Sequence, residues 1–554
     1  MKHYKKVILV MGLLSLLCAC GREEAFGPDA PAGTGKEVVT ESGAEITQQE
    51  SKDSKETEEI KEDEEMSQTN PAQYFERMII TEGYKKAVQT NPLMTQRFGA
   101  DPYAMVYGDR VYFYMTADAP EYDEAGNVVE NTYSKIRSIN VISTEDMVNF
   151  TDHGSIAAAG KGGAATWANN SWAPAAAWKE IDGQVKFFLY FANSGGGIGV
   201  LTSDSPTGPF TDPLGEALVS RNTPNCSNVL WLFDPAVLVD DDGRAYLYFG
   251  GGVPEGKVPD PGTARVVELG EDMISIKGEP QRIDVPYLFE DSGIHKFGEK
   301  YYYTYCTNWQ VDSEGTAKYG FVNAEIASME SDSPMGPFTY KERILENPGR
   351  YFGLYGNNHH CVFEFKGNWY ITYHTRTLEK AMGIEKGYRC THIDAFEMGE
   401  DGTIGKIAQT LVGREQLKNV DAYAVNPAVM IAVQGGLDTT PITDAQGAEM
   451  VLTGIDRGDF LKVQGVDFGE KAPTKWNAYI KKADSCGEDC VIQLRIGKVN
   501  GQIIGYLTME EATEQGEDGY CKYTAELLEE VTDVHDLYMI FSGSDYEMKN
   551  WYFE

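Results

Sequence analysis

The sequence predicts an all-β protein, a five-bladed β-propeller followed by a β-sandwich of the jelly-roll type. Three observations support this prediction. Five related segments each combine a short apolar strand, a turn with glycine and an aromatic-rich strand. A nine-residue motif, SDSPTGPFT, recurs as SDSPMGPFT 128 residues later. After about Gln416 the pattern changes to alternating apolar and polar residues, which is typical of sandwich strands.

The first 70 residues are predicted to lie outside the folded domains. Residues 1–20 combine a basic start with an apolar stretch too short to span a bilayer, which is typical of a signal peptide. The residues from Leu17 to Cys20 resemble a bacterial lipobox, so we expect a lipid on Cys20, with ordinary secretory cleavage as the alternative. Residues 21–70 are rich in Glu, Ser, Thr and Gln and predict a disordered acidic linker. We therefore expect an extracytoplasmic, cell-surface membrane lipoprotein that touches the membrane only through its lipid anchor.

Composition restricts the classes of partner. The formal net charge is -37, which repels nucleic acid but not a neutral glycan. The 32 tyrosines and eight tryptophans suit stacking on sugars and equally suit packing of a β-rich core, so composition alone does not decide function. The nine cysteines show no spacing typical of a zinc site.

Residues 71–417 contain the five predicted hairpins and form the predicted propeller domain. Equivalent positions at the starts of the five repeats are Asp101, Ala173, Asp234, Asp291 and His360. Consecutive starts are 57 to 72 residues apart, which is enough for a four-stranded sheet with its loops. A pair of sandwiches or a β-helix also contains strands with glycine turns, but neither predicts five copies at this spacing. In a propeller the first strand of every blade lines the axis, so residues at different starts converge.

Acidic side chains stand at the starts of three repeats, as Asp101, Asp234 and Glu290. Cleavage of a glycosidic bond needs a carboxylic acid that protonates the leaving oxygen and a carboxylate that activates water or attacks the sugar. Three acids on one axis repel one another, which raises one pKa. The alternative is that Asp-Pro only begins a strand. Asp291 competes with Glu290, because neighbouring side chains of a strand point to opposite faces.

The span from about Asn91 to Leu417 resembles glycoside hydrolase family 43, particularly its arabinoxylan-directed arabinofuranosidases. The segments that carry the resemblance are NPLMTQRFGADPYAMVYGDRVYFYMTAD, ANNSWAPA, WLFDPAVLVDDDGRAYLYFGGG, LFEDSGIHKFGEKYYYTYCTNW, GNNHHCVF and GYRCTHID. The resemblance implies hydrolysis with inversion of configuration. It implies Asp101 as general base, Asp234 as the residue that orients the acid and adjusts its pKa, and Glu290 as general acid.

The same resemblance implies a sugar pocket lined by Trp172, Asn358, His359 and Arg376. Core packing is the alternative for Trp172, and a structural ion pair is the alternative for Arg376. His359 matches the position where related enzymes hold an axial metal, often calcium through water, and a hydrogen-bonded histidine without metal is the alternative. No cofactor is expected for the chemistry itself. The segment from Tyr301 to Tyr303 is predicted to lie in the core.

Residues 418–554 resemble carbohydrate-binding module family 6. The segments that carry this resemblance are LTGIDRGDFLKVQGVDFG, VIQLRIGKVNGQIIGYLT and VTDVHDLYMIFSG with the ending NWYFE. Cys486, Cys490 and Cys521 could include one disulfide in an oxidising compartment, and the sequence does not say which.

The C-terminal segment also departs from that family's pattern. Residues 431–433 are Ile-Ala-Val where the family has Glu-Ala-Glu, and Asn550 replaces its usual Asp. We therefore expect that the family's structural calcium site is lost. Trp476, Tyr546 and Trp551 are interpreted either as sugar-stacking residues or as packed aromatics of the sandwich.

Together these observations predict an inverting, exo-acting glycoside hydrolase. The predicted activity is that of an α-L-arabinofuranosidase that removes arabinose side units from arabinoxylan, so the expected partner is a plant polysaccharide or oligosaccharide. A β-xylosidase that acts on xylo-oligosaccharides is the alternative on the same scaffold. A non-catalytic surface glycan-binding lipoprotein is the alternative from another class, and it predicts the loss of at least one of the three acids.

Overall fold

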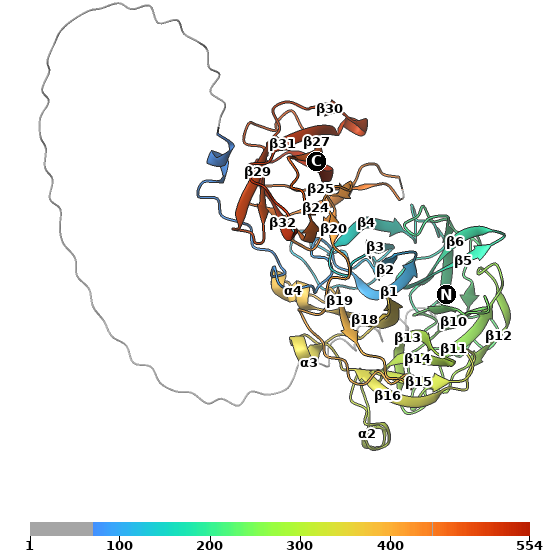
Figure 1. Cartoon of the computed structure of the whole chain (residues 1–554). Helices are drawn as coiled ribbons and strands as arrows, with labels where there is room; N and C mark the ends of the chain where they lie inside the picture. Colours follow the sequence, from blue (N-terminus) through green and yellow to red (C-terminus); the bar gives the residue numbers. More distant parts are fainter. Residues whose placement is uncertain (1–69, 446) are drawn as a thin grey trace, which may run out of the picture. The chain divides into compact units, whose positions relative to one another are not determined.

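The structure, a computed structural model, describes residues 70–445 and 447–554, which form one compact unit. Regular structure in this part is almost entirely β-sheet (Figure 1). The few helices are short: η1 (Pro71–Phe75), α2 (Ser313–Tyr319), α3 (Gly349–Phe352), α4 (Thr377–Met382) and η2 (Glu517–Gly519). In the described part, no helix has the length and apolar character that a membrane crossing requires. The predicted signal peptide, the predicted lipidation residue Cys20 and nearly all of the predicted linker lie outside the described residues.

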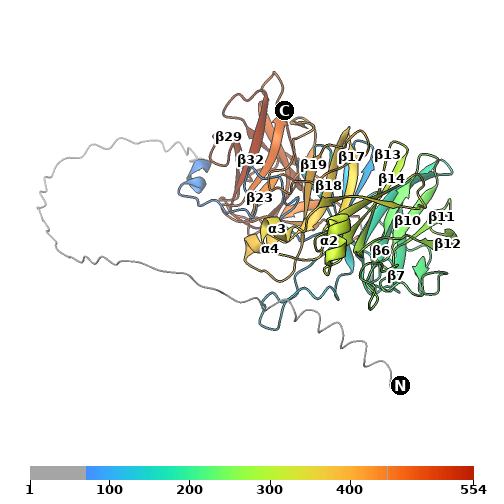
Figure 2. The same cartoon turned by 90° about the horizontal axis from the view of Figure 1, so that it is seen from below.

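The N-terminal part contains five antiparallel sheets that follow one another in chain order (Figures 1 and 2). The first holds β1 (Ala100–Tyr107), β2 (Arg110–Thr116), β3 (Ser138–Thr144) and β4 (Phe150–Ala157), and the second holds β5 (Trp172–Ile181), β6 (Gln184–Ala192), β7 (Gly197–Ser203) and β8 (Val219–Ser220). The third holds β9 (Ala236–Val239), β10 (Ala245–Phe249), β11 (Arg265–Leu269) and β12 (Ile276–Arg282). The fourth holds β13 (Leu288–Phe297), β14 (Lys300–Thr307), β15 (Ile326–Ser331) and β16 (Thr339–Leu345), and the fifth holds β17 (His360–Phe365), β18 (Asn368–Thr375) and β19 (Cys390–Phe396). Each predicted hairpin is formed by the first two strands of one sheet.

Buried tyrosines join neighbouring sheets in a repeated way. A tyrosine of the second strand in one sheet donates its hydroxyl hydrogen bond to a backbone carbonyl in the loop after the third strand of the next sheet. The four pairs are Tyr114 with Pro206, Tyr190 with Met273, Tyr248 with Pro334, and Tyr302 with Asp401, at 2.6 to 3.2 Å. Pro206 and Pro334 belong to the two copies of the SDSP motif. Both copies of the motif therefore supply the acceptor for the preceding sheet. The segment from Tyr301 to Tyr303 is buried, which confirms its predicted core position.

Two packed sheets form the C-terminal β-sandwich. One contains β20 (Val420–Asp421), β26 (Phe460–Asp467), β32 (Val534–Ser542), β28 (Val491–Ile496) and β29 (Gln502–Thr508), with β23 (Val433–Gly435) beside β26. The other contains β24 (Asp438–Pro441), β25 (Met450–Thr453), β33 (Tyr546–Phe553), β27 (Lys475–Lys482), β31 (Cys521–Glu526) and β30 (Glu514–Gln515), with β21 (Asn426–Pro427) beside β33. Trp476, Tyr546 and Trp551 are 0%, 3% and 0% exposed in the core between these sheets, so they pack the sandwich rather than face a sugar. The described cysteines include no disulfide.

The sandwich is joined to the first sheet by shared structure. Strand β22 (Met430–Ile431) pairs with β4 and extends the first sheet, although it belongs to the C-terminal part of the chain. Ile431 and Val433, where the module family has carboxylates, lie in hydrophobic clusters. Phe75, Met78 and Ile80 pack against a cluster that includes Phe460, Tyr538 and Ile540. This segment was predicted to belong to the propeller domain, but it packs on the sandwich.

A buried carboxylate connects three segments at this junction. Asp152 of β4 forms an ion pair with Arg97 and accepts hydrogen bonds from the Gln96 side chain at 2.9 Å and from the Thr439 hydroxyl at 2.7 Å. Thr439 belongs to the sandwich strand β24. Because a buried charge is costly without partners, these contacts fix the junction in one arrangement.

We expect Asp152→Ala to lower the free energy of unfolding by about 3 kcal/mol, because the change leaves Arg97 and Thr439 without their acceptor. Urea unfolding followed by fluorescence measures this loss. Asp204→Ala is the control, since Asp204 forms an exposed ion pair with Lys186 whose removal costs about 0–1 kcal/mol. Equal unfolding midpoints for the two variants would show that the junction does not depend on Asp152.

Candidate active site

A small pocket opens where the first strands of several sheets begin. Its volume is about 240 Å³, below the roughly 300–1,000 Å³ of pockets for drug-sized ligands, so it suits a single sugar unit. The lining residues are Asp101, Tyr133, Trp172, Ala173, Phe233, Asp234, Glu290, Asn357, His359 and Arg389. The three predicted acids thus converge, although they lie on different sheets and up to 189 positions apart in the sequence.

An unusual backbone conformation places these side chains. Four of the five predicted equivalent positions have a positive φ, namely Asp101 at 47°, Ala173 at 42°, Asp234 at 49° and Asp291 at 68°. The pairing register also shifts at this point in β1, β5 and β13. A bulge with a left-handed residue redirects the side chains around it. The heads of the strands therefore present their acids to the pocket instead of alternating between the two faces of a sheet.

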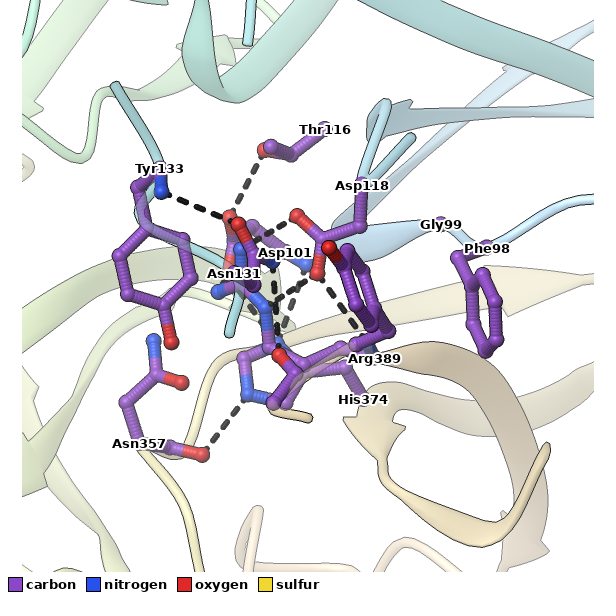
Figure 3. Close-up of polar contacts among 12 residues, drawn as sticks. Phe98, Gly99, Asp101, Thr116, Asp118, Asn131, Tyr133, Asn357, His374 and Arg389 are labelled. Atoms are coloured by element: carbon purple, nitrogen blue, oxygen red, sulfur yellow. Dashed lines mark hydrogen bonds and ion pairs between the residues drawn. The ribbon is translucent and has the colours of Figure 1, made fainter. Parts of the chain in front are cut away.

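Asp101 lies in a network that holds it ionised (Figure 3). Its Oδ1 accepts from Arg389 Nη1 at 2.8 Å and its Oδ2 accepts from the Thr116 hydroxyl at 2.7 Å. His374 Nε2 faces the Asn357 carbonyl at 2.7 Å and donates to it, so Nδ1 of the neutral ring accepts from the Asp101 backbone N–H. Burial by itself would raise the pKa of Asp101, but the charge of Arg389 and the neighbouring His374 and His359 together outweigh it and hold that pKa well below its usual range.

Arg389 is itself held by a second carboxylate. Asp118 accepts hydrogen bonds from Nε and Nη2 of Arg389, both at 2.8 Å, and a third from its backbone N–H at 3.1 Å. Figure 3 shows Arg389 between Asp118 and Asp101. This planar, two-point contact fixes the direction in which the remaining guanidinium nitrogen points. Asp118 is therefore a positioning residue for the contact between Arg389 and Asp101.

Glu290 and Asp234 differ from Asp101, because their surroundings raise their pKa values. Burial, together with the charges of Asp234 and Asp101, raises the pKa of Glu290 well above its usual range. Burial and the charge of Asp101 raise the pKa of Asp234 as well. Asp234 accepts the backbone N–H of Asp291 at 2.9 Å, whereas Glu290 Oε1 is buried without a hydrogen-bond partner among the described residues. Because only Asp234 has an N–H that stabilises its charged form, this difference favours a proton on Glu290.

Asp291 has a different position from its neighbour Glu290. It does not line the pocket; its Oδ2 lies 2.5 Å from His360 Nδ1, and its Oδ1 lies 3.2 Å from His359 Nε2. Only one of the two acids thus reaches the pocket.

The structure places two of the other predicted pocket residues in the lining and two outside it. Trp172 and His359 line the pocket. The prediction is wrong for Asn358, whose buried side chain donates to the Ala324 carbonyl, while the preceding Asn357 lines the pocket. It is also wrong for Arg376, which forms an ion pair with Glu379 and so follows the structural alternative.

Arg389 takes the place in the pocket that we had assigned to Arg376. The sequence analysis missed Arg389, although it belongs to the motif GYRCTHID.

The residues near His359 do not fit a directly bound calcium ion. Calcium takes about six to eight oxygen ligands at about 2.3–2.6 Å. Both oxygens of Asp101 are bound, to Arg389 and to Thr116, and Oδ2 of Asp291 is bound to a histidine. Among the residues that the structure describes, no three His, Cys, Asp or Glu side chains are arranged to hold a metal. The geometry therefore offers no set of direct calcium ligands around His359, and the predicted contact of His359 with a calcium ion through water stays a prediction.

A deprotonated and a protonated carboxyl group on one small pocket are typical of enzymes that hydrolyse glycosidic bonds. Comparisons with known proteins agree. The family model for glycosyl hydrolases family 43 matches residues 89–404, and that for carbohydrate binding module family 6 matches residues 427–554. The chain belongs to glycosyl hydrolases family 43, and its C-terminal part is a family 6 module.

Individual relatives match most of the chain. An arabinoxylan arabinofuranohydrolase of Paenibacillus polymyxa is 46% identical and covers 82% of this chain and 72% of its own length. One of Bacillus subtilis is 43% identical and covers 82% and 90%. A crystal structure of a family 43 arabinoxylan arabinofuranohydrolase from Bacillus subtilis in complex with cellotetraose matches with a TM-score of 0.80 at 40% identity, over 86% of this chain and 99% of that one.

Replacement of Arg389 by methionine should move the acidic limb of the pH profile for kcat/KM. Arg389 lowers the pKa of Asp101, and a general base must be ionised, so activity falls as the pH drops through that pKa. Without the guanidinium, we expect the fall to begin about 1–3 pH units higher. Arg376→Met is the matched control, because that arginine pairs with a carboxylate outside the pocket. An unchanged acidic limb in Arg389→Met would contradict this account of Asp101.

Removal of divalent cations should leave the enzyme unchanged. We expect the melting temperature and kcat to stay the same after dialysis against a chelator and after addition of calcium, because no group of acidic, His or Cys side chains in the described part of the chain is arranged to hold a metal ion. Differential scanning calorimetry and a hydrolysis assay measure the two quantities. A melting temperature that rises with calcium would reveal an ion site that these side chains do not explain.

Proposed function

We propose that the protein is an inverting, exo-acting α-L-arabinofuranosidase that removes arabinose side units from arabinoxylan. The observation that carries this proposal is the small pocket lined both by Asp101, whose pKa is lowered, and by Glu290, whose pKa is raised and whose Oε1 has no partner among the described residues. A pocket of this size admits one sugar unit, which favours exo action. The names of the two relatives at 46% and 43% identity support arabinoxylan as the substrate.

Each carboxyl group has a separate role in the proposed reaction. Asp101 takes a proton from a water molecule, whose oxygen attacks the anomeric carbon, while Glu290 gives its proton to the glycosidic oxygen as that bond breaks. Attack from the face opposite to the leaving group inverts the configuration. The negative charge of Asp234 raises the pKa of Glu290, so in this reaction Asp234 keeps the acid protonated and orients it.

We also propose the finer architecture. The five sheets are the blades of a propeller that spans residues 71–417, and residues 418–554 form a jelly-roll sandwich. The signal peptide and the lipid on Cys20 would make the protein extracytoplasmic and hold it at the cell surface. This part of the proposal rests on the basic and apolar pattern of residues 1–20.

Variants of the two acids should respond differently to the leaving group. We expect Glu290→Gln to lower kcat on arabinoxylan by about 10²–10⁴-fold, but far less on dinitrophenyl arabinofuranoside, whose leaving group needs no proton. Asp101→Asn should lose activity on both substrates, because both need activated water. Initial rates, with the anomer of the first product identified by proton NMR, test the two roles and the inversion.

Several outcomes would reject the proposal. Parental turnover of Glu290→Gln on both substrates would exclude its role as the acid. Release of xylose from xylo-oligosaccharides with no release of arabinose would identify the β-xylosidase alternative. Binding of xylan without release of any sugar would identify the non-catalytic glycan-binding alternative.

A further inference from the structure

The loop between β2 and β3 holds one aromatic residue over the pocket in a strained conformation. Tyr133 has a φ of 58°, a region that bulky residues rarely adopt. Its backbone N–H donates to Asn131 Oδ1 at 3.0 Å, and its carbonyl accepts from Trp172 Nε1 at 3.0 Å and from Asn170 Nδ2 at 3.2 Å. Strain that several contacts maintain beside a pocket indicates a functional position.

The ring of Tyr133 forms part of the wall of the pocket. The Arg389 guanidinium lies over the ring at 4.9 Å from its centre, and Trp172 meets it edge-on at 6.4 Å. Tyr133 is 36% exposed, so its ring covers part of Arg389 and remains partly open to solvent. Figure 3 shows the Tyr133 hydroxyl on the same side of Asp101 as the Asn357 side chain, which also lines the pocket.

The hydroxyl of Tyr133 is available to a ligand. It makes no hydrogen bond with any residue that the structure describes, unlike the buried tyrosines that join the sheets. Burial raises the pKa of Tyr133, so the group remains a donor at neutral pH. Asp101 and Glu290, the proposed base and acid, line the same pocket as Tyr133.

The loop is anchored away from the pocket, so it presents Tyr133 rigidly. Glu121 is 8% exposed and accepts from the Thr132 hydroxyl at 2.7 Å and from Lys135 at 2.8 Å. Asn131 donates its backbone N–H to the Lys386 carbonyl at 2.8 Å, and the Tyr388 hydroxyl donates to the backbone of this loop. The loop of the first sheet is thereby tied to the segment that leads directly to Arg389.

We propose that Tyr133 is a substrate-binding residue that determines specificity: its hydroxyl donates a hydrogen bond to a hydroxyl group of the sugar unit in the pocket, and its ring closes one side of that pocket. This inference rests on the proposed function, because it assigns a ligand to the same site. Under this proposal Tyr133 contacts the sugar that is released and not the polysaccharide backbone.

Tyr133→Phe tests the hydrogen bond, since it removes only the hydroxyl. We expect kcat/KM to fall about 3- to 10-fold, and by the same factor on arabinoxylan and on an aryl arabinofuranoside, because the two substrates share the released sugar. The melting temperature should stay the same, as the hydroxyl has no protein partner to lose. Tyr122→Phe is the matched control on the same loop, because Tyr122 is 60% exposed and lies outside the pocket lining.

Binding of free arabinose separates this inference from the proposed function. Calorimetry with Glu290→Gln as the background should show weaker arabinose binding after Tyr133→Phe and unchanged binding after Tyr122→Phe. If the background binds arabinose and Tyr133→Phe binds it equally well, the inference is wrong while the proposed function stands. If the parent neither binds arabinose nor releases it from any substrate, the proposed function fails first.

Comparison of the Tyr133 variants on different substrates tests the inference further. A loss confined to arabinoxylan would place Tyr133 against the backbone and overturn the inference. Tyr133→Ala should also lower the ratio of arabinofuranoside to xyloside hydrolysis, because it opens one wall of the pocket. A ratio equal to that of the parent would show that the ring does not set specificity.

Discussion

The site depends on one buried cation between two carboxylates. Arg389 bridges Asp101 and Asp118, which belong to the first sheet region, although the arginine immediately precedes the third strand of the fifth sheet. Each of these charges would be costly to bury alone, so the three stabilise one another only when the first and fifth sheets meet correctly. The same contact keeps Asp101 ionised and supports the ring of Tyr133. The contact that joins the first and fifth sheets therefore also keeps the proposed base, Asp101, ionised.

The protein separates the two carboxyl groups that its chemistry needs by giving them different surroundings. Asp101 has a cation and a hydroxyl donor, whereas Glu290 has neighbouring negative charge and an unpartnered oxygen. Both are buried, so differences in hydrogen bonding and in neighbouring charge decide which of them holds a proton. The left-handed residues at the strand heads make this possible, because they turn acids of different sheets toward one pocket.

Prediction from sequence worked where a pattern was repeated. The five hairpins correspond to the first strands of the five sheets, and the acids at their starts converge on one pocket. It failed for residues in the fifth repeat, where Asn358 was chosen over Asn357 and Arg376 over Arg389. Sequence spacing does not give the directions in which the side chains of Asn357 and Asn358 point. It also does not distinguish the two arginines, because both stand next to strands of the same sheet. The N-terminal segment that includes Phe75 packs against a cluster of residues from the sandwich and from the first sheet region, which the sequence pattern did not indicate.

The sequence by itself determined the β-rich class, the repeats with their turns, and the acids that the chemistry requires, because these follow from local chemistry copied along the chain. Only the tertiary structure decided which arginine meets Asp101, which tyrosine covers the pocket and which carboxyl group keeps its proton. Those features join residues as far as 288 positions apart, and their energies depend on burial and charge that exist only after the sheets have packed.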